Sequence, residues 1–131
     1  MNADGSGRGE LIDPHPGTTV PGFTQSIPAW SPDGSRIAFQ IDLGPSQGQE
    51  IFVVDADGTN LQQLTSNAGR DNHSPSWTPD STQIVFTSRR DPGNDGEVWI
   101  MDANGDNEQP IMSDNSWPDS YAAMSPDGMK I

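Results

Sequence analysis

Three polar residues of the chain, Gln25, Asn72 and Asp119, follow one another at intervals of 47 residues, and Asp71 and His73 flank the middle one. Carboxylate and amide oxygens are the ligands that calcium takes in proteins. If strands bring these positions to a common axis, Asp71, Asn72 and Asp119 are candidate ligands of a calcium ion. The competing interpretation is that all five side chains bond exposed backbone or contact a partner peptide. The sequence leaves both interpretations open.

The interval of 47 residues organises the rest of the chain as well. The string AWSPDG at 29–34 returns as SWTPDS at 76–81 and as AMSPDG at 123–128. A second string, VDADG at 54–58, returns as MDANG at 101–105. A period in the forties with several short strands per unit is typical of β-propeller blades. The recurring residues that we interpret as structural are Trp30, Asp33, Gly58, Trp77, Asp80, Gly105 and Asp127.

The hydrophobic pattern inside each unit predicts β-strands. Ile37, Phe39 and Ile41 are two residues apart, which is the period of one face of a strand. The runs at 51–54 and 98–101 are instead continuously apolar. Such runs favour strands that neighbouring sheets cover on both faces.

Each apolar run leads through an Asp-Gly or Asn-Gly turn into a shorter and more polar segment. Outer strands are therefore expected at 10–12, 61–64 and 108–112. Pro110 fits only the edge of a sheet, because proline has no N–H to donate to a neighbouring strand. The predicted fold class is all-β, with propeller blades of four antiparallel strands that make up an incomplete propeller segment.

Two repeated residue types have structural interpretations. Trp30 and Trp77 recur in phase with the strands, so we expect both to anchor blade cores rather than to stack on a ligand. Asp33, Asp80 and Asp127 follow a proline in each copy and are expected to form turns.

The combined motifs resemble the TolB-like β-propeller repeat. The pattern PxWSPDGxxIAF is carried by 28–39, and EIxVxDADG with a later Leu-Thr by 50–65; a second copy occupies 75–86 and 97–105. The resemblance implies a propeller that binds peptides or partner proteins. It also implies an extracytoplasmic location, either periplasmic or secreted.

The repeat divides the chain into four parts. Residues 1–26 are expected to hold an orphan outer strand and a loop rich in proline and glycine, and 121–131 the start of a further blade. Whole blades are expected at 27–73 and 74–120. Because repeat arrays need about three units with capped ends, we expect additional blades or self-association to cover the end faces, rather than a stable closed monomer.

The composition excludes some classes of partner. The net charge of −13, from 19 acidic against 6 basic residues, argues against nucleic acid and favours cations or basic partners. The chain has no cysteine, so it forms neither a disulfide nor a thiolate metal site. No apolar run approaches the 18 or so residues of a membrane helix, so we expect no membrane insertion.

Residues that could perform catalysis are few. The only histidines are His15 and His73, and the chain contains no Gly-x-Ser-x-Gly motif. We therefore predict a non-catalytic scaffold or protein-binding module with no required cofactor other than the hypothetical calcium. Two alternatives stay open: the gating propeller of a larger hydrolase like prolyl oligopeptidase, and a self-assembling structural protein.

Overall fold

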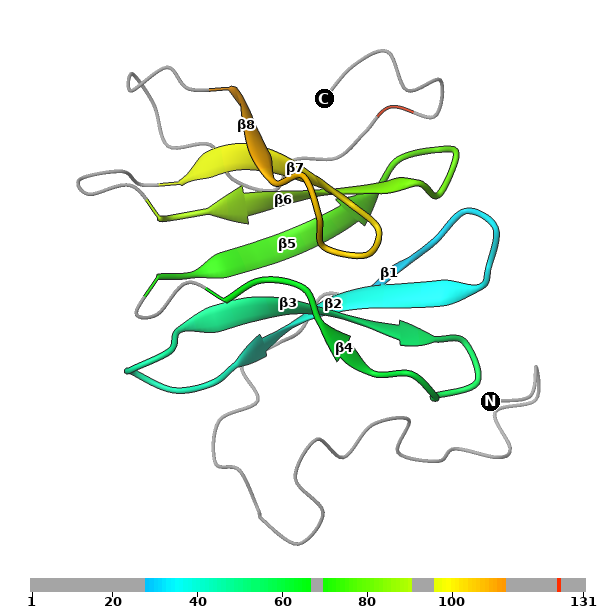
Figure 1. Ribbon diagram of the computed structural model, residues 1–131, viewed down its shortest axis with the longest axis horizontal. Helices are drawn as coiled ribbons and strands as arrows, with labels where there is room; N and C mark the ends of the chain where they lie inside the picture. The colour runs from blue at the N-terminus through cyan, green and yellow to red at the C-terminus, as the bar shows by residue number, and fades with distance from the viewer. Residues whose placement is uncertain (1–27, 67–69, 91–95, 113–124, 126–131) are drawn as a thin grey trace, which may run out of the picture.

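A computed structural model describes residues 28–66, 70–90, 96–112 and 125, and every regular element in these ranges is a β-strand. The strands form two four-stranded antiparallel sheets, each in sequence order (Figure 1). Blade 1 consists of β1 (Ala29–Trp30), β2 (Arg36–Asp42), β3 (Gln49–Asp55) and β4 (Gln62–Gln63). Blade 2 consists of β5 (Asn72–Trp77), β6 (Gln83–Ser88), β7 (Glu97–Asp102) and β8 (Gln109–Met112). The predicted all-β fold with four-stranded blades is confirmed.

The strand register repeats with the sequence. Phe39 lies opposite Phe52 in blade 1, and Phe86 lies opposite Trp99 at the same place in blade 2. The outer strands β4 and β8 fall inside the predicted segments, and Pro110 lies on the edge strand β8. Strand β5 begins at Asn72, two residues before the predicted start of the second blade. The strand expected at 10–12 lies outside the described residues.

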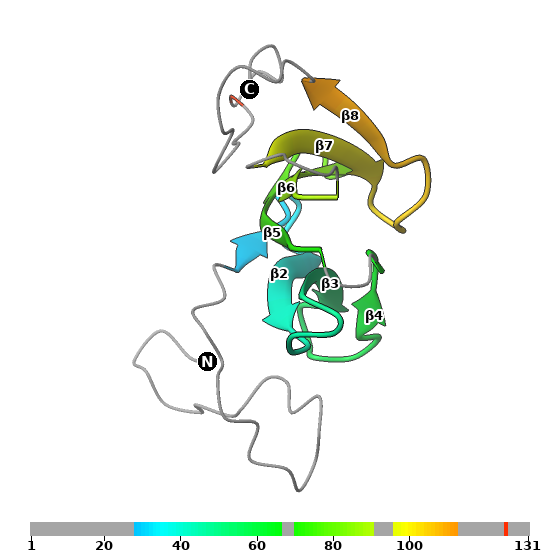
Figure 2. The same ribbon diagram turned by 90° about the vertical axis from the view of Figure 1, so that its left-hand side faces the viewer.

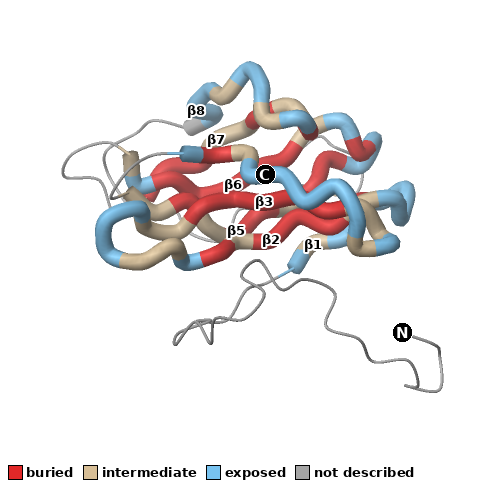
Figure 3. The backbone as a smooth tube through the Cα atoms, turned by 60° about the horizontal axis from the view of Figure 1, so that its bottom comes forward, coloured by how far each residue is buried: buried red, intermediate tan, exposed pale blue. Residues whose placement is uncertain are grey.

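The two blades stack face to face, and their main hydrophobic core lies between them (Figure 2). Burial is greatest in the middle strands, whereas the turns and outer strands are more exposed (Figure 3). Ile51 and Val54 of β3 have no exposed surface, so this strand is covered on both faces as predicted. The buried members of the core between the blades are Ala38, Ile51, Val53, Trp77, Ile84, Phe86, Met101 and Ala103.

The two repeated tryptophans differ in burial. Trp77 is 5% exposed, and its indole N–H donates to the carbonyl oxygen of Ala29 at 2.9 Å. Trp30 is 58% exposed, so the prediction that it anchors a blade core is wrong. The reason is its neighbours: blade 1 covers Trp77, but Trp30 lies opposite Ile37 on the face of blade 1 that is turned away from blade 2.

The turns that follow β1 and β5 confirm the predicted role of the aspartates. Asp33 accepts hydrogen bonds from the Ser31 hydroxyl at 2.6 Å and from the Ser35 hydroxyl and backbone N–H at 2.8 and 3.0 Å. These bonds lower the pKa of Asp33 to about 2, the Ser31 hydroxyl having the largest effect. Asp80 makes the same set of bonds in blade 2. Asp127 lies outside the described residues.

The hairpin turns after β1, β3, β5 and β7 lie together at one edge of the blades, toward the right in Figure 1. The β2–β3 loop and the start of β5 lie at the opposite edge. Within the described residues there is no helix that is long and apolar enough to span a membrane.

Candidate binding site

The start of β5 is irregular. The pairing of β5 with β6 shifts register between His73 and Ser76, and Ser74 has a positive φ of 56°. A left-handed backbone at a residue other than glycine costs on the order of 1–3 kcal/mol and occurs both in turns and at functional sites. The Ser74 N–H donates to the side-chain oxygen of Gln40 in blade 1 at 2.7 Å. The two blades therefore meet at this irregular segment.

Five polar side chains surround the irregular segment, and we call Gln40, Gln49, Asp71, His73 and Arg89 the rim cluster. The Gln40 side chain donates to that of Gln49 at 3.3 Å. Asp71 Oδ1 accepts the Gln49 backbone N–H at 3.1 Å, and Asp71 Oδ2 lies 3.6 Å from Arg89 Nη1. The Asp71 and Arg89 side chains are 38% and 49% exposed. The rim cluster thus offers both charges and several amide groups to a partner.

His73 is the titratable group of the rim cluster nearest neutrality. Its Nδ1 lies 3.1 Å from the Ser74 hydroxyl. Burial lowers the pKa of His73 most, the Arg89 charge lowers it further, and the Asp71 charge opposes both. The ring is therefore neutral at neutral pH, and it can act as a hydrogen-bond donor and acceptor without adding charge.

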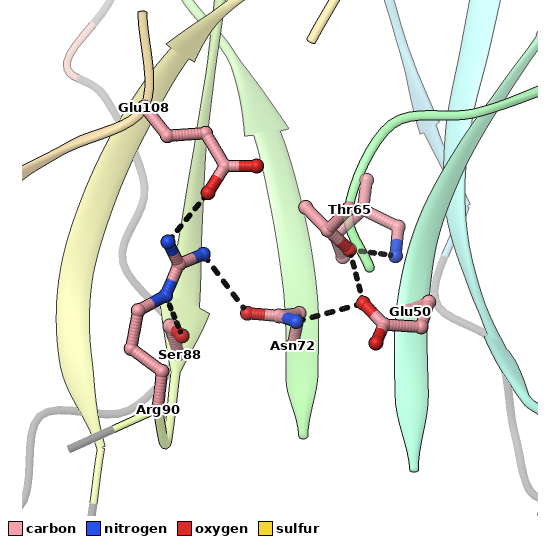
Figure 4. Close-up of polar contacts among 7 residues, drawn as sticks. Glu50, Thr65, Asn72, Ser88, Arg90 and Glu108 are labelled. Carbon is pink, nitrogen blue, oxygen red and sulfur yellow. Dashed lines mark hydrogen bonds and ion pairs between the residues drawn. The ribbon is translucent and has the colours of Figure 1, made fainter. Parts of the chain in front are cut away.

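Asn72 points into the junction between the blades, not toward solvent (Figure 4). Its amide nitrogen donates to the Glu50 carboxylate at 2.8 Å, and the Thr65 hydroxyl donates to the same oxygen at 2.5 Å. The Asn72 carbonyl receives a long hydrogen bond of 3.5 Å from Arg90, which also forms an ion pair with Glu108. Both polar ends of this fully buried side chain therefore have partners, the amide nitrogen in blade 1 and the carbonyl oxygen in blade 2.

Arg90 is held in place by an aromatic surface as well as by these polar partners. Its guanidinium carbon lies 3.8 Å from the centroid of the Trp99 ring, and its Nε donates to the Ser88 hydroxyl at 2.9 Å. The sequence analysis did not predict this polar junction between the blades, which joins Glu50, Asn72 and Arg90. A signal was present, because Glu50 and Glu97 recur 47 residues apart at the start of otherwise apolar strands.

Of the five binding candidates from the sequence, the structure places Asp71 and His73 in one partly exposed cluster, and Asn72 beside them in the interior. Gln25 and Asp119 lie outside the described residues. In the ranges that are described, no three histidine or acidic side chains gather as a metal site would require. The candidate calcium ligands are Asp71, Asn72 and Asp119, and because Asp119 lies outside the described residues, the calcium site stays a prediction.

The repeat provides an internal control for the rim cluster. The positions of Gln40 and Gln49 in blade 1 are occupied by Thr87 and Gly96 in blade 2, and that of Arg89 is occupied by Asp42 in blade 1. A blade therefore forms without these particular side chains. The rim cluster is a local addition to the repeat rather than a requirement of it.

Comparisons with known proteins agree with this architecture. The putative TolB from Agrobacterium tumefaciens is 27% identical, with a TM-score of 0.68, over 79% of this chain and 36% of that one. TolB from Acinetobacter baumannii is 28% identical, with a TM-score of 0.65, over 79% of this chain and 25% of that one. The chain thus spans about a third and a quarter of these two proteins. An oligogalacturonate lyase, 23% identical with a TM-score of 0.51, shows likeness of fold alone.

No sequence of a curated protein matches the chain. The family model described as the TolB beta propeller domain matches residues 17–131, which is most of its length. This match agrees with the repeated motifs and with the two four-stranded blades. The chain therefore belongs to the TolB β-propeller domain family.

Proposed function

We propose that the chain is a non-catalytic, extracytoplasmic module that binds a protein or peptide partner through the rim cluster. The observation that carries the proposal is the gathering of Asp71, His73 and Arg89 around a strained segment, at positions where the two blades differ in sequence. The match of the chain to the TolB β-propeller family and its likeness to two TolB structures support a propeller module, and the resemblance to that family implies that the module binds a protein or peptide.

The backbone around Ser74 favours recognition through side chains. An extended peptide that adds to a sheet edge needs free N–H and C=O groups along that edge. The Ser74 N–H is already bonded to Gln40, and the next residue, Pro75, has no N–H. The inner edge of β5 is therefore a poor template for strand addition, and we expect the partner to contact Arg89 and His73 instead.

A selection of linear peptides from a display library against the chain tests the proposal. We expect a selected peptide to bind in fluorescence anisotropy and its affinity to fall at least tenfold in the Arg89→Ala and His73→Gln variants. The matched control is Gln62→Ala, an exposed residue of the outer strand β4 that pairs with Val53 and with no residue of the rim cluster, and it should leave binding unchanged. Equal binding by all variants would place the site elsewhere on the chain.

A further inference from the structure

Asn104 and Gly105 lie in the hairpin turn between β7 and β8 (Figure 1), and Asn104 is the one asparagine of the sequence that precedes a glycine. The Gly105 N–H donates to the Asp102 carbonyl oxygen at 2.8 Å, and Gly105 has a φ of +92°. An asparagine side chain can react with the backbone nitrogen of the next residue, and glycine leaves that nitrogen unhindered because it has no Cβ. The pair is therefore a candidate for self-modification.

Blade 1 shows that this position stays exposed when a further blade packs beside it. Asp57 lies 47 residues before Asn104, and it is exposed although blade 2 packs against blade 1. The two turns are alike: the Thr59 N–H donates to Asp57 Oδ1 at 2.9 Å, and the Asp106 N–H donates to Asn104 Oδ1 at 3.1 Å. Asn104 is exposed as well, so water reaches its side chain independently of the number of blades.

The folded turn holds the groups that would react. The Asn104 amide nitrogen donates to Asp106 Oδ2 at 2.9 Å, and the Gly105 N–H is bonded to Asp102. The attacking nitrogen and the leaving amide must both give up a hydrogen bond before they react. Local opening of an exposed turn costs much less free energy than unfolding of the whole structure. The fold therefore slows the reaction without preventing it.

We propose that Asn104 is a site of spontaneous deamidation, and that the reaction proceeds when the turn opens. The Gly105 nitrogen forms a bond to Asn104 Cγ and loses its proton, the bond between Cγ and the amide nitrogen breaks, and ammonia leaves with that proton. Water then opens the cyclic imide at either of its two carbonyl groups. One product is aspartate. The other is isoaspartate, whose backbone runs through Cβ and is longer by one methylene group.

The turn lies between two contacts with blade 1, so the two products differ in their effect. The Ala103 carbonyl oxygen accepts a hydrogen bond from Arg36 Nη1 at 3.2 Å. The Gly105 backbone lies close to blade 1, since a Cβ there would be 3.2 Å from the Leu64 carbonyl oxygen. Isoaspartate lengthens the backbone between these contacts and loosens the packing of the blades. Aspartate keeps the backbone length and only places a second carboxylate beside Asp106.

Incubation of the full chain in mildly alkaline buffer, followed by peptide mapping with mass spectrometry, tests the proposal. The comparison is a synthetic peptide of residues 99–109. We expect aspartate and isoaspartate to accumulate at Asn104, at least tenfold more slowly in the folded chain than in the peptide. Asp106→Ala frees the Asn104 amide and should raise the rate in the folded chain at least threefold. Asn107 is the internal control: it is exposed in the same hairpin but precedes a glutamate, and it should stay unmodified.

A second measurement compares the products. Chains that contain isoaspartate, separated by chromatography, should unfold at a lower urea midpoint than the Asn104→Asp variant. Four results would overturn the proposal. Asn104 would not be a reactive site if it stays intact in the chain and in Asp106→Ala while the peptide is converted. Equal rates in chain and peptide would show that the turn does not control the reaction, and equal modification of Asn107 would show that the glycine does not direct it. Equal midpoints would remove the effect on the packing of the blades.

Discussion

The Thr87 side chain provides a sensitive test of the packing in blade 2. Thr87 has no exposed surface, and its hydroxyl has no hydrogen-bond partner among the described residues. A buried polar group without a partner costs about 1–3 kcal/mol. Thr87→Val keeps the shape and removes the hydroxyl, so we expect the free energy of unfolding to rise by about 1 kcal/mol. With a urea m-value of about 1–3 kcal/mol/M, the unfolding midpoint should rise by roughly 0.3–1 M.

The same substitution in blade 1 serves as the matched control. Thr65 is equally buried, but its hydroxyl donates to the Glu50 carboxylate at 2.5 Å and accepts the Ile51 N–H at 2.9 Å. Thr65→Val removes a hydrogen bond to a charged group, so it should destabilise the fold by about 1.5–3 kcal/mol. If Thr87→Val instead lowers the midpoint as Thr65→Val does, the Thr87 hydroxyl has a partner, such as a buried water, and the reasoning is refuted.

Three further predictions follow from pKa shifts and from backbone geometry. The pKa of His73 is lowered from 6.5, so the neutral ring stabilises the fold above pH 6.5, and this contribution is lost as the pH falls through the lowered pKa. The urea midpoint of the unsubstituted chain should therefore fall between pH 7.5 and 5. In His73→Gln the midpoint should depend less on pH over the same range. Ser31→Ala removes the main cause of the low pKa of Asp33, so an NMR titration should show it rising from about 2 toward 3.8. Gly105→Ala should lower the free energy of unfolding more than Gly44→Ala does. Both glycines have a φ of +92°, but a Cβ at Gly105 would lie 3.2 Å from the Leu64 carbonyl oxygen, whereas a Cβ at Gly44 would have no atom within 4 Å. Equal losses of stability in the two variants would show that backbone strain alone, and not this close contact, sets the cost.

The sequence predicted the blades well because the same local interactions occur twice. Asp33 and Asp80 each close a turn through hydroxyl and N–H groups within two residues of the carboxylate. Such short-range hydrogen bonds can be predicted from the local sequence. The apolar run of β3 was equally clear, since a strand buried on both faces needs no particular partner to be recognised.

Predictions that depended on distant neighbours were less complete. Trp30 and Trp77 occupy the same place in the repeat, yet within the described part of the chain only Trp77 has a blade packed against it. Two of the five rim-cluster residues, Asp71 and His73, were predicted from their place in the repeat. The contact between Gln40 and Ser74 joins residues 34 positions apart, and no periodicity relates them.

The hydrogen bond between Glu50 and Asn72 also bears on how the chain avoids misassembly. Apolar faces that recur every 47 residues fit one another almost equally well, and arrays of similar units are prone to exchanging them between copies. The Asn72 amide donates to the buried Glu50 carboxylate at 2.8 Å across the junction, and an ionised carboxylate in its place would have no proton to donate. The bond therefore favours packing against blade 1 of a unit that has a donor at this position, which is a polar requirement that the recurring apolar faces do not impose.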